Sequence, residues 1–167
     1  SLVAALPIVD GDILKIYGVN DLANEKLVTL QVRARTFEGK VLSDVTQIET
    51  RIIPDSSRMI WQGTIKNILD KHNPENAVIE ILLKSAEGKT LYRRLFYLVP
   101  PKKLSLPRVS INMKVEPIND GYQLTLSSER IAKNVYIGTE VDGFFSDNYF
   151  DLLPGENKVV FFKTERI

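Results

Sequence analysis

Residues 142–162 hold the side chains of this chain that are best suited to chemistry. The run, DGFFSDNYFDLLPGENKVVFF, contains six aromatic rings, whereas the whole chain is only 8% aromatic. Acidic and amide side chains stand between the rings. Aromatic faces of this kind can stack on sugars, and a pair of carboxylates can cleave a glycosidic bond. The same residues can also build the corner of a β-sandwich.

Turn and strand-edge positions account for the carboxylates of this run, which are Asp142, Asp147, Asp151 and Glu156. Asp147, Asn148 and Asp151 could offer oxygen ligands to calcium, but the twelve-residue spacing of a calcium loop is absent. We therefore predict neither a catalytic carboxylate pair nor a metal site in this run.

Other residue types that carry chemistry are scarce. The chain has no cysteine and one histidine, His72. This excludes thiolate nucleophiles, disulfides and metal sites built on several histidines. Because His72 precedes Asn73 and Pro74, we expect it in a solvated loop. Nothing resembles a nucleophile elbow or a glycine-rich phosphate loop, so the sequence predicts no catalytic residue and no cofactor.

The favoured interpretation of the aromatic run is structural, with its rings packed between two sheets. In the strand at 158–163, Val159 and Phe161 are expected on one face and Val160 and Phe162 on the other. Residues 153–156 suit a type II turn, and residues 146–148 suit a corner held by side-chain bonds to the backbone. As the only tryptophan, Trp61 is expected in a core or an interface. The alternative is a sugar or domain contact, with the candidates Trp61, Phe144, Phe145 and Tyr149.

The elements that must position these residues are strands, because a period of two dominates the chain. Residues 28–35 alternate apolar and polar side chains, which predicts a strand with one buried face. Glu-Gly-Lys at 38–40 and at 87–89 places glycine where a hairpin turn needs positive φ. Only residues 63–76 hint at helix, and Pro74 limits it to a turn or two. Further strands are predicted at 13–17, 46–53, 77–83, 90–99, 109–115, 122–127, 135–139, 149–153 and 158–163.

The stretch VPPKKLSLP, residues 99–107, is the clearest boundary in the chain. Its three prolines interrupt the strand pattern and are typical of a rigid short linker. We predict an all-β fold of two tandem immunoglobulin-like β-sandwich domains, residues 1–104 and 105–167. Strands separated by turn signals every 10–14 residues or so are typical of such sandwiches.

Composition excludes several classes of partner. The 167 residues carry a net charge of +1, so a nucleic acid or an anionic membrane has no electrostatic support. No apolar run approaches the roughly 20 residues that span a bilayer. The sequence starts at Ser1, has methionine only at Met59 and Met113, and lacks the start of a signal peptide. We expect it to be a piece of a longer protein.

Two longer stretches resemble a known family. The run GFFSDNYFDLLPGE, residues 143–156, resembles the C-terminal immunoglobulin-like domain of β-mannosidases in glycoside hydrolase family 2. LYRRLFYLVPPKKLSLP, residues 91–107, is similar to the connector before that domain. The resemblance identifies residues 1–104 as a mannosidase-type, sugar-module-like sandwich and residues 105–167 as the small C-terminal sandwich. Residues 1–60 match only in their strand pattern.

This resemblance implies a role without catalysis. The family hydrolyses terminal β-mannosyl units with two carboxylates on a (β/α)8 barrel, a fold of about 250 residues for which this chain is too short. No stretch matches the catalytic motifs. The implied partners are that barrel and other domains of the same chain, with an oligosaccharide as a further candidate, but neither nucleic acid nor membrane. The parent enzyme is expected in the periplasm or outside the cell.

Two rival interpretations remain open. The chain could be an autonomous carbohydrate-binding module, which would expose two or three aromatic rings about one sugar apart. It could instead be an adhesion or interaction sandwich that binds no carbohydrate. Within the glycosidase interpretation, β-galactosides and β-glucuronides are alternative substrates of the parent enzyme, because accessory domains do not distinguish between these substrates.

Overall fold

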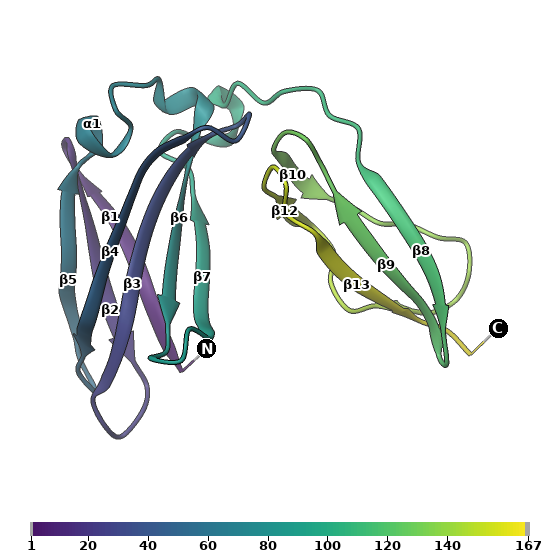
Figure 1. The fold of residues 1–167 in the computed structure, drawn as a ribbon, viewed down its shortest axis with the longest axis horizontal. Coiled ribbons are helices and arrows are strands. Elements are labelled where there is room, and N and C mark those ends of the chain that lie inside the picture. Colours follow the sequence, from purple (N-terminus) through teal and green to yellow (C-terminus); the bar gives the residue numbers. More distant parts are fainter. Residues whose placement is uncertain (1, 166–167) are drawn as a thin grey trace. The chain divides into compact units, whose positions relative to one another are not determined.

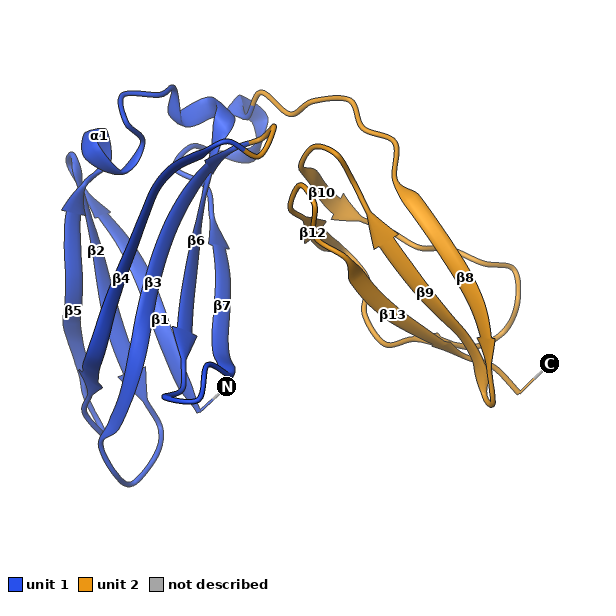
Figure 2. Ribbon diagram, in the orientation of Figure 1, with its two compact units in different colours: residues 1–36, 40–104 blue, residues 37–39, 105–167 orange. Residues whose placement is uncertain are grey.

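The computed structural model describes residues 2–165 as two compact units (Figure 1, Figure 2). Unit 1 holds the described residues up to Thr36 together with Lys40–Leu104. Unit 2 holds Phe37–Gly39 and the described residues from Ser105 onward. Each unit has its own sheets and its own buried apolar cluster.

Unit 1 is a sandwich of two antiparallel sheets (Figure 1). The three-stranded sheet has the order β1-β2-β5, formed by β1 (Val3–Asp10), β2 (Ile13–Asn20) and β5 (Ser57–Thr64). The four-stranded sheet has the order β4-β3-β6-β7, formed by β4 (Val41–Ile52), β3 (Lys26–Thr36), β6 (Ala77–Lys84) and β7 (Thr90–Phe96).

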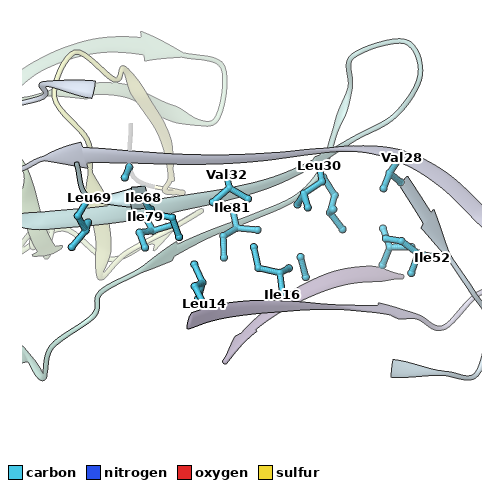
Figure 3. Packing of buried hydrophobic residues seen from close by; sticks show 14 of the residues in the cluster. Leu14, Ile16, Val28, Leu30, Val32, Ile52, Ile68, Leu69, Ile79 and Ile81 are labelled. Carbon is cyan, nitrogen blue, oxygen red and sulfur yellow. The ribbon is translucent and has the colours of Figure 1, made fainter. Parts of the chain in front are cut away.

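Alternate side chains of the facing strands fill the core of unit 1. Figure 3 shows Leu14 and Ile16 of β2 facing Val32 of β3 and Ile81 of β6, and each of these side chains is at most 1% exposed. The alternation follows from strand geometry, which points successive side chains to opposite faces. The buried face of β3 is therefore the one that the sequence pattern predicts.

Unit 2 is a smaller sandwich with unequal sheets. One sheet has the order β11-β13-β9-β8, formed by β11 (Phe144–Phe145), β13 (Lys158–Lys163), β9 (Gly121–Ser127) and β8 (Asn112–Ile118). The other sheet has only β10 (Ala132–Val135) and β12 (Phe150–Leu152). Its buried cluster consists of Leu124, Leu126, Ala132, Val135, Leu152 and Val160. The predicted all-β fold of two β-sandwiches is thus confirmed.

The turns behave as their residues predict. Gly39 and Gly88 have φ angles of 98° and 85°, which are values that glycine adopts at no steric cost. In the turn at 153–156, Gly155 has φ of 75°, and Glu156 N donates to Leu153 O at 3.1 Å. In the segment 63–76, for which the sequence hints at helix, helical structure is limited to α1 (Ile65–Ile68) and the short 3-10 turn η1 (Pro74–Asn76). A second 3-10 turn, η2 (Pro101–Lys103), lies in the predicted linker.

Several strand predictions were wrong. The strands β1, β5 and β11 were not predicted, and the strand expected at 109–115 lies instead at Asn112–Ile118. The strand expected at 135–139 ends at Val135. Pro7 lies inside β1, which tolerates it because this strand is at the edge of its sheet.

No helix within residues 2–165 is long and apolar enough to cross a bilayer.

Candidate functional site

The aromatic run contributes less to the core than predicted. Phe162 is 5% exposed and lies in the core face of β13, whereas Phe144 is 83% exposed and Tyr149 is 69% exposed. Phe145 and Phe150 are half-buried. The prediction that these rings are buried is therefore wrong for Phe144 and Tyr149, and also for Phe161, which is 41% exposed.

Phe145 is half-buried and packs against the core of unit 2. Its ring lies 4.7 Å from the ring of Phe162, with the two planes tilted by 35°. Phe144 precedes it on the other face of β11 and borders a hollow of about 760 Å³ that Asp120, Asp142 and Lys163 also line. Two of the candidate contact residues that are adjacent in sequence thus have different surroundings.

Tyr149 forms an exposed pair with Tyr136, a residue that the sequence did not single out. The two ring centroids are 5.1 Å apart and the ring planes are tilted by 31°. Tyr136 is 63% exposed, and its ring lies against Gly138. Because each ring covers part of the other, the pair offers one stacking position rather than two. We call it the tyrosine pair.

The backbone at Tyr149 takes an unusual conformation to present this ring. Tyr149 has φ of 54°, a left-handed value that bulky residues rarely adopt. The side chain of Asn148 holds it in place: its amide oxygen accepts from Tyr149 N at 3.1 Å and from Ile137 N at 2.7 Å. Asn148 Nδ2 donates to Ile137 O at 2.9 Å. Strained backbone that is held in place by such hydrogen bonds is often found at ligand-binding and active sites.

A partly exposed ion pair lies next to this corner. Lys158 Nζ lies 2.7 Å from Asp147 Oδ2 and 5.2 Å from the centroid of the Phe150 ring. The hydrogen bond from Lys158 lowers the pKa of Asp147, and partial burial opposes that effect. Lys158 therefore ties the corner at residues 146–148 to β13.

Two other carboxylates of the run accept hydrogen bonds from backbone N–H groups. Asp151 Oδ1 accepts from Asn134 N at 2.8 Å, and Glu156 Oε2 accepts from Leu153 N at 3.1 Å. Within residues 2–165 no group of three or more histidine, aspartate or glutamate side chains could hold a metal ion. These carboxylates therefore stabilise turns and strand ends.

Trp61 lies in unit 1, on edge strand β5 opposite Ile16. It is half-buried and packs against the core of that unit. Its indole also covers Gly63, because a Cβ atom there would lie only 2.6 Å from Trp61 Cη2. The expected core packing thus accounts for much of the indole surface.

His72 is half-buried in the loop after α1, where its backbone N donates to Leu69 O at 2.9 Å.

Sequence reasoning also missed a buried carboxylate on unit 1. Glu80 is only 6% exposed, and its Oε2 lies 2.7 Å from Arg93 Nε. Arg33 and Arg35 approach the same carboxylate at 3.9 Å, and Arg33 also pairs with Asp44 at 3.1 Å. A glutamate between apolar neighbours in VIEILL gives no signal of burial, because its partners come from two other strands.

These observations define a class of protein: a tandem of immunoglobulin-like sandwiches with exposed aromatic side chains. Residues 12–103 match the family model of the mannosidase Ig/CBM-like domain. Residues 106–167 match a second family model, a mannosidase Ig-fold domain. The chain belongs to the mannosidase Ig/CBM-like domain family, with the Ig-fold domain following it.

Solved structures share this fold at low sequence identity. The β-D-mannosidase from Dictyoglomus thermophilum is similar over 98% of this chain, with a TM-score of 0.73 and 19% identity. The exo-chitosanase CsxA from Amycolatopsis orientalis is similar over 93%, with a TM-score of 0.60 and 12% identity. The chain spans only 20% and 23% of their lengths. No curated protein matches the chain by sequence.

Proposed function

We propose that residues 1–167 form the non-catalytic accessory region of a β-mannosidase-like glycosidase. The region consists of two domains, residues 1–104 and 105–167. It packs on the catalytic barrel of the same polypeptide and helps to shape the access of substrate to that barrel. The observation that carries this proposal is the pair of family matches, in which two mannosidase domains follow each other across almost the whole chain.

The solved structures support the same proposal. Both are structures of glycosidases, and the similar region takes up about a fifth of each chain. The remaining length leaves room for a catalytic barrel, which takes about 250 residues. The carboxylates of Asp147, Asp151 and Glu156 are held by an ion pair and by backbone N–H groups, so the chemistry is assigned to another part of the parent enzyme.

Hydrolysis assays test this proposal directly. Residues 1–167 should release no detectable p-nitrophenol from p-nitrophenyl β-D-mannopyranoside, whereas the longer polypeptide that contains them should release it. Parallel assays with the β-galactoside, β-glucuronide and β-glucosaminide identify the substrate of the parent. Turnover by residues 1–167 alone, or a gene that encodes no barrel, would show that the proposal is wrong.

The tyrosine pair supports a second candidate function, carbohydrate binding by unit 2. Two exposed tyrosine rings offer an apolar face with hydroxyl groups at its edge, a combination that suits a sugar ring. Because the pair has one stacking position, binding should be weak. Affinity electrophoresis in mannan and glucomannan gels should show retardation that Tyr149→Ala and Tyr136→Ala both abolish. Trp61→Ala and Phe144→Ala test the other candidate contacts, and equal mobility with and without polysaccharide would exclude this function.

A further inference from the structure

Unit 2 has an apolar groove along one side of its larger sheet. Its lining includes Met113 and Val115 of β8, Ile137 and Val141 of the segment after β10, and the rings of Tyr122 and Phe162. The groove measures about 200 Å³, and its lining is almost wholly apolar. We call it the β8 groove.

The groove exists because the second sheet of unit 2 is short. That sheet has only β10 and β12, and residues 136–143 form no strand that would cover β8. All seven residues of β8 are exposed, and Met113 and Val115 keep 54% and 49% of their surface in solvent. Neither belongs to the buried cluster of the unit. Adjacent exposed apolar side chains of this kind are typical of a surface that packs against a partner.

The edge of β8 is protected against pairing with another strand. Pro117 removes one backbone donor, and Lys114 forms a 2.7 Å ion pair with Glu116 on the same strand. Proline and lysine are the residues that natural edge strands use to prevent such pairing. A second copy of the chain is therefore disfavoured as a strand partner. The apolar wall formed by Met113 and Val115 stays open to a partner that packs by its side chains.

The size and polarity of the groove indicate what fits it. An apolar cavity of about 150 Å³ takes up a benzene molecule, so the β8 groove has room for one leucine or phenylalanine side chain. A saccharide would find few hydrogen-bonding groups there, because the lining is apolar. The solved glycosidases extend to about five times the length of the region they share with this chain. A neighbouring domain of a longer polypeptide is the occupant that these facts favour.

We infer that another domain of the parent polypeptide docks on the β8 groove and inserts an apolar side chain beside Met113. This inference rests on the proposed function, in which the chain is part of a longer glycosidase. It specifies the surface of unit 2 that contacts the other domain. Because the contact is apolar, it should persist at high salt, where an attachment through exposed ion pairs would weaken.

Thiol labelling tests this inference, since the 167 residues contain no cysteine. Met113→Cys places a thiol in the groove, and Lys114→Cys places one on the opposite face of the same strand. In residues 1–167 alone, both thiols should react with a maleimide at similar rates. In the parent polypeptide, with any native cysteines replaced, labelling at position 113 should slow about tenfold or more. Labelling at position 114 should change little.

Methionine oxidation provides a second measurement that needs no substitution. Met113 and Met59 are 54% and 45% exposed, so peroxide should oxidise both in residues 1–167. Peptide mass spectrometry should then show Met113 protected in the parent polypeptide. Equal oxidation and labelling at position 113 in the short and long chains would overturn the inference. The inference would also be overturned if position 113 were already protected in residues 1–167 alone. The same holds if its protection increased with the concentration of this 167-residue chain.

These outcomes are separate from the test of the proposed function. If the gene encodes no further domain, the proposed function fails and the inference fails with it. If the parent polypeptide hydrolyses a β-mannoside while Met113 stays reactive, only the docking surface is wrong. Parent variants that fold and hydrolyse substrate normally confirm that labelling reports the native arrangement.

Discussion

The rings of Phe162 and Phe144 should contribute very different free energies to the folding of unit 2, because one ring is buried and the other is exposed. Phe162 is 5% exposed and packs against Phe145, whereas Phe144 is 83% exposed. We expect Phe162→Ala to lower the free energy of unfolding of unit 2 by about 3–5 kcal/mol. Phe144→Ala should change it by less than about 0.5 kcal/mol. Urea unfolding followed by the methyl NMR signals of unit 2 measures both, and similar losses would contradict this assignment.

Asp147 should make the stability of unit 2 depend on pH. Lys158 lowers the pKa of Asp147, so the folded chain binds a proton at this carboxyl less readily than the unfolded chain does. The pair therefore stabilises the fold above the unfolded pKa of about 3.9. That contribution is lost as the pH falls through the lower folded value. Both groups are partly exposed, so it is about 0.2–1 kcal/mol.

The corresponding experiment compares Asp147→Asn with the parent sequence between pH 3 and pH 7. The variant should unfold at a lower urea concentration near pH 6, and the difference should shrink below about pH 4. In a Lys158→Met background, the pH-dependent effect of Asp147→Asn should be clearly smaller, because only the hydrogen bond from Asn148 N then lowers the pKa of Asp147. A difference that grows as the pH falls would mean that the ion pair is not its source.

At the level of single residues, sequence patterns predict burial only where a strand is regular. The alternation along β3 correctly marks Leu30 and Val32 as part of its buried face. The strand pattern expected over residues 149–153 fails at Tyr149, because a residue with φ of 54° leaves the extended conformation on which the alternation depends. The partner of Tyr149 was missed because Tyr136 lies 13 positions earlier, in a segment predicted to be a strand.

Among the elements, the corner at residues 146–148 is bonded to the segment after β10 through one amide side chain. Asn148 bonds to both backbone groups of Ile137, much as a strand residue would. Asn148→Ala leaves these groups without that partner, so unit 2 should lose about 1–3 kcal/mol of stability. Asn157→Ala is the matched control, since Asn157 is exposed and its replacement should cost less than about 0.5 kcal/mol. Equal effects of the two substitutions in urea unfolding would show that the corner does not need Asn148.

Regular strands were predicted well, and irregular strands were not. β3 and β6 alternate or run apolar because sheets pack on their faces. β5 has a register shift opposite Ile16 and Tyr17, so its sequence shows no regular period. β11 has two residues and depends on β13 for its pairing. Pairing between distant segments has no local sequence signal, and this is why these elements were missed.

On the scale of the whole molecule, the sequence predicts the order of the two sandwiches but not all the residues of unit 2. The prolines at 99–107 predict a boundary, and the two family models match residues 12–103 and residues 106–167. Phe37–Gly39 nevertheless belong to unit 2. In the sequence these residues read as an ordinary hairpin turn, and nothing local shows that Phe37 becomes 0% exposed.

This composition of unit 2 predicts that residues 105–167 are less stable alone than in the full chain. Phe37 is fully buried, its carbonyl accepts from Ile131 N at 2.8 Å, and Gly39 lies against Pro154. Losing a buried phenylalanine costs about 3–5 kcal/mol, a large share of the stability of a small domain. Amide exchange at Leu124 and Val160 should therefore be much faster in residues 105–167 than in the full chain. Phe37→Ala should reproduce most of that acceleration, whereas Val41→Ala, at a 52% exposed position, should not. Equal exchange in the short and full chains would mean that unit 2 folds without Phe37.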